Sequence, residues 1–179
     1  MKGSVVGILL FGLLLAGLSL WAPPVRAHCE IPCGIYEDHM RVAMIAEHIT
    51  TIEKSMQQIS ELAGAGEKNY NQLVRWIANK EEHAGKIQEI VHQYFLTQRV
   101  KPAAPDDVEG YAKYVKQLTL LHQMLISAMK SKQTTDLGHV ETLRSLLHEF
   151  EAAYFGPEAG ERVEGSESKH MPHGSTHKH

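Results

Sequence analysis

Apolar residues recur every three or four positions through most of this chain, and that spacing is the strongest constraint on its fold. Proline is absent between Cys33 and Lys101, and runs of β-branched residues are rare. The first two apolar stripes predict helices over about 37–62 and 68–98, with Gly64 ending the first. They comprise Val42, Ile45, Ile49, Ile52, Met56 and Ile59, and then Leu73, Trp76, Ile77, Ala84, Ile87, Val91 and Tyr94.

Two more stripes follow a loop that contains prolines at positions 102 and 105. Asp106 or Asp107 can cap the third helix, and Thr135 or Asp136 can cap the fourth. The stripes comprise Tyr111, Tyr114, Leu118, Leu121, Leu125 and Met129, and then Leu137, Val140, Leu143, Leu147, Phe150 and Tyr154. Four amphipathic helices joined by short loops predict an all-α, up-and-down four-helix bundle over residues 37–155. The methionines at 56, 124 and 129 are expected to pack in its core.

Residues 1–27 have the layout of a cleaved signal peptide. Lys2 precedes an apolar run of about 17 residues, two prolines end that run, and Val25 and Ala27 place small residues before a cut at His28. We therefore expect a signal peptidase to remove this segment and the protein to be exported, to the periplasm or outside the cell, without stable membrane insertion. An uncleaved anchor remains the alternative, although the run is at the short limit for a membrane span.

Charge and composition exclude several classes of protein. The chain carries a net charge of −3 and the leader +2, so the remainder carries −5 and has no dense basic stripe for nucleic acid. Two cysteines exclude a disulfide-rich scaffold. From Gly156 onward the chain is rich in Gly, Glu, Ser and His without an apolar period, which predicts a disordered tail over 156–179.

Both cysteines lie in residues 28–36, where the sequence reads His-Cys-Glu-Ile-Pro-Cys-Gly-Ile-Tyr. Cleavage would give His28 a free α-amine. That amine, the backbone nitrogen and sulfur of Cys29, and the sulfur of Cys33 can lie in one plane, with the His28 imidazole above it. Planar nitrogen and sulfur ligation suits Ni(II) or Cu(II), and these strong donors would stabilise trivalent nickel.

Other interpretations of the same residues remain open on chemistry alone. In an oxidising compartment Cys29 and Cys33 can form a disulfide, which has similar weight to a metal site. A tetrahedral zinc site would be one ligand short, since only His28 joins the two thiolates. The segment can also be an incidental terminus.

The complete string His-Cys-x-x-Pro-Cys-Gly-x-Tyr, placed directly after a predicted cleavage site, resembles the N-terminal hook of nickel superoxide dismutase. The resemblance implies an antioxidant enzyme that converts superoxide to O₂ and H₂O₂ with one nickel per subunit, cycling between Ni(II) and Ni(III). It implies that His28, Cys29 and Cys33 bind the metal, that Pro32 forms the bend, and that Gly34 lets the hook close.

The resemblance also implies that Tyr36 stands near the open axial face and limits access to small anions. Tyr94 is a candidate partner of the Tyr36 hydroxyl, and Glu47 is a weaker candidate for a hydrogen bond to the axial imidazole. Family members form homohexamers, which implies a homo-oligomer here. The four tail histidines (His170, His173, His177 and His179) can buffer nickel or simply be solvated.

Two other functions compete with the enzyme. One is a non-catalytic exported protein that binds nickel or copper, and the other is a structural helical protein with a Cys29–Cys33 disulfide. A di-iron site is rejected because no paired inward-facing Glu-x-x-His motif is present.

Overall fold

The computed structural model describes residues 34–65 and 69–156. The predicted signal peptide, the hook residues 28–33 and the tail from residue 157 onward lie outside this described part, so the predictions made for them stay predictions. The helical unit begins at Ile35.

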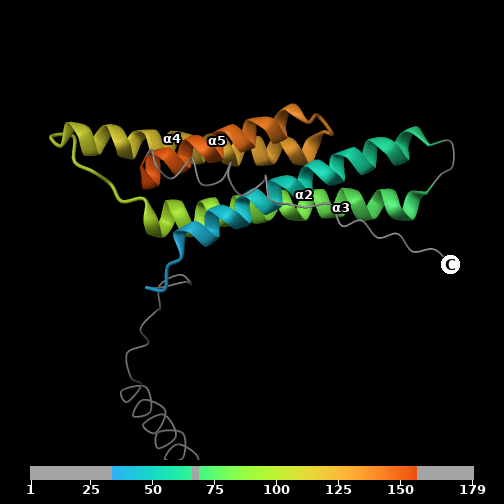
Figure 1. The fold of residues 1–179 in the computed structure, drawn as a ribbon, viewed down its shortest axis with the longest axis horizontal. Helices are drawn as coiled ribbons and strands as arrows, with labels where there is room; N and C mark the ends of the chain where they lie inside the picture. Colours follow the sequence, from blue (N-terminus) through green and yellow to red (C-terminus); the bar gives the residue numbers. More distant parts are fainter. Residues whose placement is uncertain (1–33, 66–68, 157–179) are drawn as a thin grey trace, which may run out of the picture. The chain divides into compact units, whose positions relative to one another are not determined.

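The described residues form four helical segments, the second of which changes type along its length. They are α2 (Asp38–Gly64), α3 (Tyr70–Glu89) with its continuation η1 (Ile90–Arg99), α4 (Val108–Gln133) and α5 (Gly138–Phe155). Successive segments run in opposite directions, and α2 and α4 each pack against both α3 and α5 (Figure 1). The predicted all-α four-helix bundle is confirmed. None of these described helices has the length and apolarity needed to cross a membrane.

The core follows the predicted stripes closely in α2 and α5. All six stripe residues of α2 are buried, and Val140, Leu143, Leu147 and Phe150 of α5 are buried as well. The second stripe is correct from Ala84 onward. Burial of these aliphatic side chains supplies the main stabilisation of the bundle, at about 25 cal/mol per Å² of apolar surface.

The first part of the second stripe is wrong. Leu73 and Trp76 are only half-buried, and Ile77 is 40% exposed. In Figure 1 the α2–α3 hairpin extends past the turn between α4 and α5, so this part of α3 has only α2 to pack against.

The third stripe is wrong in its orientation. The buried face of α4 lies about one residue before the predicted one, so Tyr111 and Met129 are 41% and 40% exposed, whereas Met124 is fully buried. This face comprises Gln117, Leu120, Leu121, Met124, Ser127, Ala128 and Ser131. Its small side chains bring α4 close to its neighbours, and Met129 instead lines a surface cavity of about 500 Å³ between α4 and the α3–η1 segment.

The N-terminal cap of α4 agrees with the sequence prediction, and that of α5 differs from it. The Asp107 carboxylate accepts a hydrogen bond from the Gly110 amide at 3.0 Å and caps α4 as expected. At α5 the preceding residue is Leu137, which cannot cap, and the Asp136 carboxylate accepts from the Gly138 amide at 2.9 Å. The backbone amide of Asp136 donates a hydrogen bond to the hydroxyl of Thr134, and not to that of Thr135.

A buried lysine caps the C-terminal end of α4. Lys80, on α3, is 4% exposed, and its Nζ donates to the backbone oxygens of Ser131, Lys132 and Thr134 at 2.6–2.8 Å. Carbonyls in the last turn of a helix have no partner within the helix. Lys80 supplies that partner from the neighbouring helix, and burial lowers its pKa.

The η1 segment is a π-helix of ten residues, a rare conformation that is more often a single turn. The Val100 amide bonds back to the Phe95 oxygen, and the Thr97 and Gln98 side chains donate to carbonyls five residues earlier. Because the hydrogen bonds of a π-helix span five residues, each turn takes more residues than in an α-helix, and Tyr94 and Arg99 lie closer to one face. That placement builds the site described next.

Candidate metal centre

The described part of the chain begins at Gly34, near the end of the hook. Gly34 has φ +79°, in the left-handed region that favours glycine, and an added Cβ would meet nothing within 4 Å. The backbone conformation, rather than lack of space, therefore requires glycine here. This agrees with the expectation that Gly34 lets the hook turn, while His28, Cys29, Pro32 and Cys33 lie outside the described residues.

The Tyr36 ring is held by two side chains of η1. The Arg99 guanidinium carbon lies 4.3 Å from the ring centroid, and the Tyr94 ring meets it edge-on with centroids 5.9 Å apart. A guanidinium over an aromatic face is attracted by the ring quadrupole. Tyr36 remains 38% exposed, so its ring is positioned and still accessible to solvent.

The predicted pairing of Tyr94 with the Tyr36 hydroxyl is wrong in its detail. The two tyrosines meet through their rings, and the Tyr94 hydroxyl donates to Asp38 Oδ1 at 2.6 Å. Tyr94 is 3% exposed. Burial and the adjacent Asp38 carboxylate raise the pKa of Tyr94 to about 12, which keeps its hydroxyl protonated.

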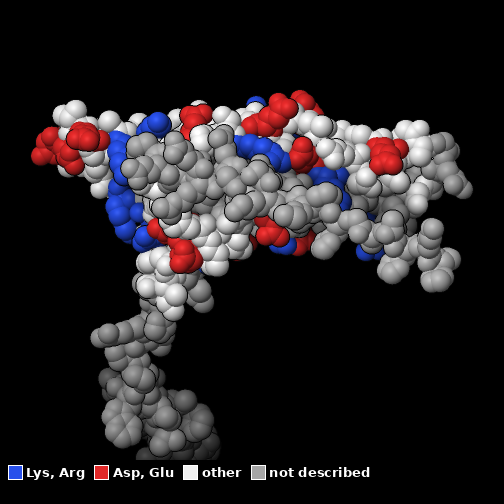
Figure 2. All heavy atoms as spheres, viewed as in Figure 1, with Lys and Arg blue, Asp and Glu red and all other residues white. Residues whose placement is uncertain are grey.

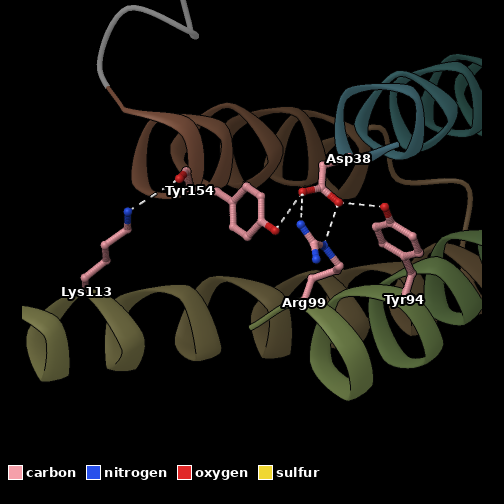
Figure 3. A network of polar contacts seen from close by, with 5 residues as sticks. All are labelled: Asp38, Tyr94, Arg99, Lys113 and Tyr154. Atoms are coloured by element: carbon pink, nitrogen blue, oxygen red, sulfur yellow. Dashed lines mark hydrogen bonds and ion pairs between the residues drawn. The ribbon is translucent and has the colours of Figure 1, made fainter. Parts of the chain in front are cut away.

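Asp38, the first residue of α2, is the centre of the polar network at this end of the bundle (Figure 3). Its carboxylate accepts from Tyr94, from Arg99 Nε at 2.8 Å and Nη2 at 2.7 Å, and from the Tyr154 hydroxyl at 3.0 Å. Lys113 Nζ donates to the Tyr154 backbone oxygen at 3.5 Å. The network thus joins α2 to η1, α5 and α4.

The contacts in this network fix the protonation state of each group in it. Burial alone would raise the pKa of Asp38, but the hydrogen bonds from Arg99, Tyr94 and Tyr154 outweigh it and hold that pKa below its ordinary value. The Asp38 hydrogen bond raises the pKa of Arg99, and burial together with Asp38 raises that of Tyr154. Asp38 therefore stays ionised and both tyrosines stay neutral at pH 7.

Sequence reasoning missed Asp38, Arg99 and Tyr154 as a group. An acidic residue at a helix start is normally attributed to the helix dipole, and Arg99 would not share a face with Tyr94 in an α-helix. The one available signal was the position of Asp38, two residues after the hook tyrosine. Glu47 is exposed on α2 and is not part of this network.

The chemistry of the donor set fits nickel. Within residues 34–65 and 69–156 no group of three or more His, Cys, Asp or Glu side chains is placed to hold a metal ion. Residues 28–33 contain two thiolates, a backbone amide and a histidine whose amine cleavage would free, and such nitrogen and sulfur donors suit planar Ni(II).

Comparison with known proteins identifies the family. The family model described as nickel-containing superoxide dismutase matches residues 23–157, which include the hook and all the described helices. No curated protein and no solved structure matches the chain. The match covers more than half of the chain and agrees with the hook motif and the helical fold. The chain therefore belongs to the nickel-containing superoxide dismutase family, whose enzymes use nickel to dismutate superoxide.

Proposed function

We propose that this enzyme is exported, that removal of residues 1–27 exposes His28, and that His28, Cys29 and Cys33 then bind the catalytic nickel. One observation carries the proposal. The hook motif begins at the residue that cleavage would make the N-terminus, and it lies within the matched region. The positive φ of Gly34 supports a chain reversal at the end of the hook. Nickel, when bound there, supplies a one-electron Ni(II)/Ni(III) couple.

We propose that Tyr36 faces the substrate. Converting two superoxide anions to O₂ and H₂O₂ consumes two protons, so a proton donor is required. Tyr94 is a poor donor because Asp38 binds its hydroxyl and its pKa is about 12. Tyr36 is more accessible, and no hydrogen bond occupies its hydroxyl within the described residues. We assign Tyr36 two roles: it orders water at the metal site, and it lets only small anions reach that site.

Positive charge near this end of the bundle suits an anionic substrate. Lysine and arginine side chains gather beside the segment that joins η1 to α4, next to a group of acidic side chains at the tip where α4 begins (Figure 2). Arg41 lies 5.0 Å from the Tyr94 ring centroid, and Arg99 covers the Tyr36 ring. Such charge raises the encounter rate with anions, an effect that falls as ionic strength rises.

The N-terminus is the feature to test first. Two samples would be compared, one starting at His28 and one with a single extra glycine before it, both loaded with nickel. The first should consume superoxide and the second should be inactive, because the extra residue removes the α-amine ligand. Mass spectrometry of the exported protein should show a chain that begins at His28. Equal activity in both samples would refute the ligand set, and nickel binding without superoxide consumption would favour a non-catalytic carrier.

Tyr36→Phe tests the second part of the proposal. We expect superoxide consumption to fall about tenfold or more while nickel content is unchanged. Tyr111→Phe is the matched control, because Tyr111 is similarly exposed on α4. Equal rates for the two variants would argue against a role for the Tyr36 hydroxyl.

We further propose a homohexamer with one nickel per subunit, following the family resemblance, and a location in the periplasm or outside the cell. Sedimentation of the mature chain and cell fractionation test these two points. A monomer that retains full activity would exclude the hexamer as a requirement.

A further inference from the structure

Two histidines face each other between α2 and α3, outside the hook and the Asp38 network. The Nδ1 atoms of His48 and His83 form a hydrogen bond of 3.0 Å, in which one ring donates and the other accepts, and the rings meet nearly edge-on at 77° with centroids 4.9 Å apart. His48 is 8% exposed and His83 is half-buried. The pair is therefore fixed by packing on the inner side and reachable from the side of His83.

The separation of the two nitrogens suits a shared metal ion. Imidazole nitrogens bind transition metals at about 2.0–2.1 Å, so two nitrogens 3.0 Å apart would subtend about 91–97° at one ion. That is the angle between adjacent ligands in planar or octahedral sites, which Cu(II) and Ni(II) prefer. A tetrahedral zinc ion would need a wider separation, of about 3.3–3.4 Å.

Burial of the pair favours neutral imidazoles. Burial lowers the pKa of His48 and of His83, and the Lys86 ammonium lowers both further. Glu47 and Glu82 act in the opposite direction on the pKa of both imidazoles, but burial outweighs them. Lys86 itself is paired with Glu82 at 2.6 Å. Neutral imidazoles are the form that binds metals. For both Nδ1 atoms to bind one ion, the ring that now donates the hydrogen bond must carry its proton on Nε2 instead.

We propose that His48 and His83 form a second metal site, which takes one Cu²⁺ or Ni²⁺ ion through the two Nδ1 atoms. Water molecules complete its coordination. The bound ion links α2 to α3. This site is independent of the hook, because every residue in it belongs to the helical bundle.

The test uses the full mature chain with Cys29→Ser and Cys33→Ser, which removes the thiolate ligands of the hook. Cu²⁺ binding is measured at pH 7.5 by calorimetry and by electron paramagnetic resonance. We expect His48→Gln with His83→Gln to bind one ion fewer per chain and to lose a signal with two imidazole nitrogens. His92→Gln with His148→Gln is the matched control, because both residues are exposed, on η1 and α5, and it should leave that ion in place.

Two further measurements keep the test decisive if the double variant folds poorly. His83→Gln alone, at the half-buried position, should weaken binding at this site by tenfold or more. In the parent, Cu²⁺ should raise the melting temperature at pH 7.5 but not at pH 5, where the imidazoles are protonated. Unchanged stoichiometry and spectrum in both His83 variants would overturn the proposal, as would Cu²⁺ that leaves the parent's melting temperature unchanged at pH 7.5.

Discussion

Replacing Asp38 with asparagine tests whether its carboxylate holds together the end of the bundle where α2 begins. The amide has the same shape but no charge, and its NH₂ group would face donors instead of accepting from them. Two of the four hydrogen bonds lost or weakened come from the charged Arg99 guanidinium. The change therefore removes charge-assisted contacts while leaving the local volume unchanged.

The expected loss follows from the burial of the pair. A hydrogen bond to a charged group contributes about 1.5–3 kcal/mol, whereas an exposed ion pair contributes less than about 1 kcal/mol. The Asp38 and Arg99 side chains are 15% and 27% exposed, so their pairing is partly screened by solvent. We expect Asp38→Asn to lower the free energy of unfolding by about 2–3 kcal/mol, or the melting temperature by about 10 °C.

Urea unfolding followed by circular dichroism at pH 7 measures this loss. The matched control is Glu53→Gln, which breaks the ion pair between Glu53 and Arg144, whose side chains are 35% and 41% exposed. That control should cost less than about 1 kcal/mol. Losses of equal size in the two variants would refute the importance assigned to the Asp38 network.

The same experiment has a pH signature. The pKa of Asp38 is lowered in the folded protein, so its contribution is complete above the ordinary value of 3.8 and is lost as pH falls through the folded value. The stability difference between the parent and Asp38→Asn should therefore shrink in acid. A difference that stays constant from pH 7 to pH 2 would contradict the proposed ionisation.

Three further perturbations test other parts of the bundle. Because the pKa of Tyr94 rises from 10.0 to about 12 on folding, the protein should lose about 2–3 kcal/mol of stability between pH 10 and 12. Tyr94→Phe should abolish that loss in alkaline denaturation curves. A curve that is the same in parent and variant would show that Tyr94 is not its cause. Lys80→Met should lower the free energy of unfolding in urea by about 2 kcal/mol, because three carbonyls at the end of α4 lose their donor. An unchanged free energy would mean that water replaces the ammonium group as donor. The pKa values of His48 and His83 are lowered by burial, so stability should fall as pH drops below their ordinary value of 6.5. His83→Gln should flatten this limb in melts from pH 7 to 5, and an equally steep limb would exclude the pair as its cause.

The helices and their approximate ends were predictable because apolar periodicity and helix breakers act locally. Helix α2 runs from 38 to 64 against the predicted 37–62, and the second segment ends at 99 against 98. The orientation of α4 was not predictable in the same way. Its most apolar face includes Met129, yet the buried face uses Ser127 and Ser131, because close helix approach depends on the partner helix.

The candidate site likewise contains residues that local sequence could predict and residues that only the fold brings together. The hook motif and Tyr36 could be recognised from adjacent residues, and both lie within the region that the family model matches. The Asp38 network could not, because Tyr154 lies 116 positions from Asp38 and is brought there only by the fold. The His48–His83 pair depends likewise on how α2 and α3 pack.

The π-helical η1 makes the length of one segment matter more than its composition. Tyr94 and Arg99 reach the same Asp38 oxygen because five residues separate them along a widened helix. Exposed Thr97 can vary with little cost, but deleting a single residue between Tyr94 and Arg99 would shift the later part of the helix by a fraction of a turn. Arg99 would then leave both Asp38 and the Tyr36 ring. Relatives of this chain that keep the network should therefore conserve the spacing from Tyr94 to Arg99 even where the intervening side chains differ.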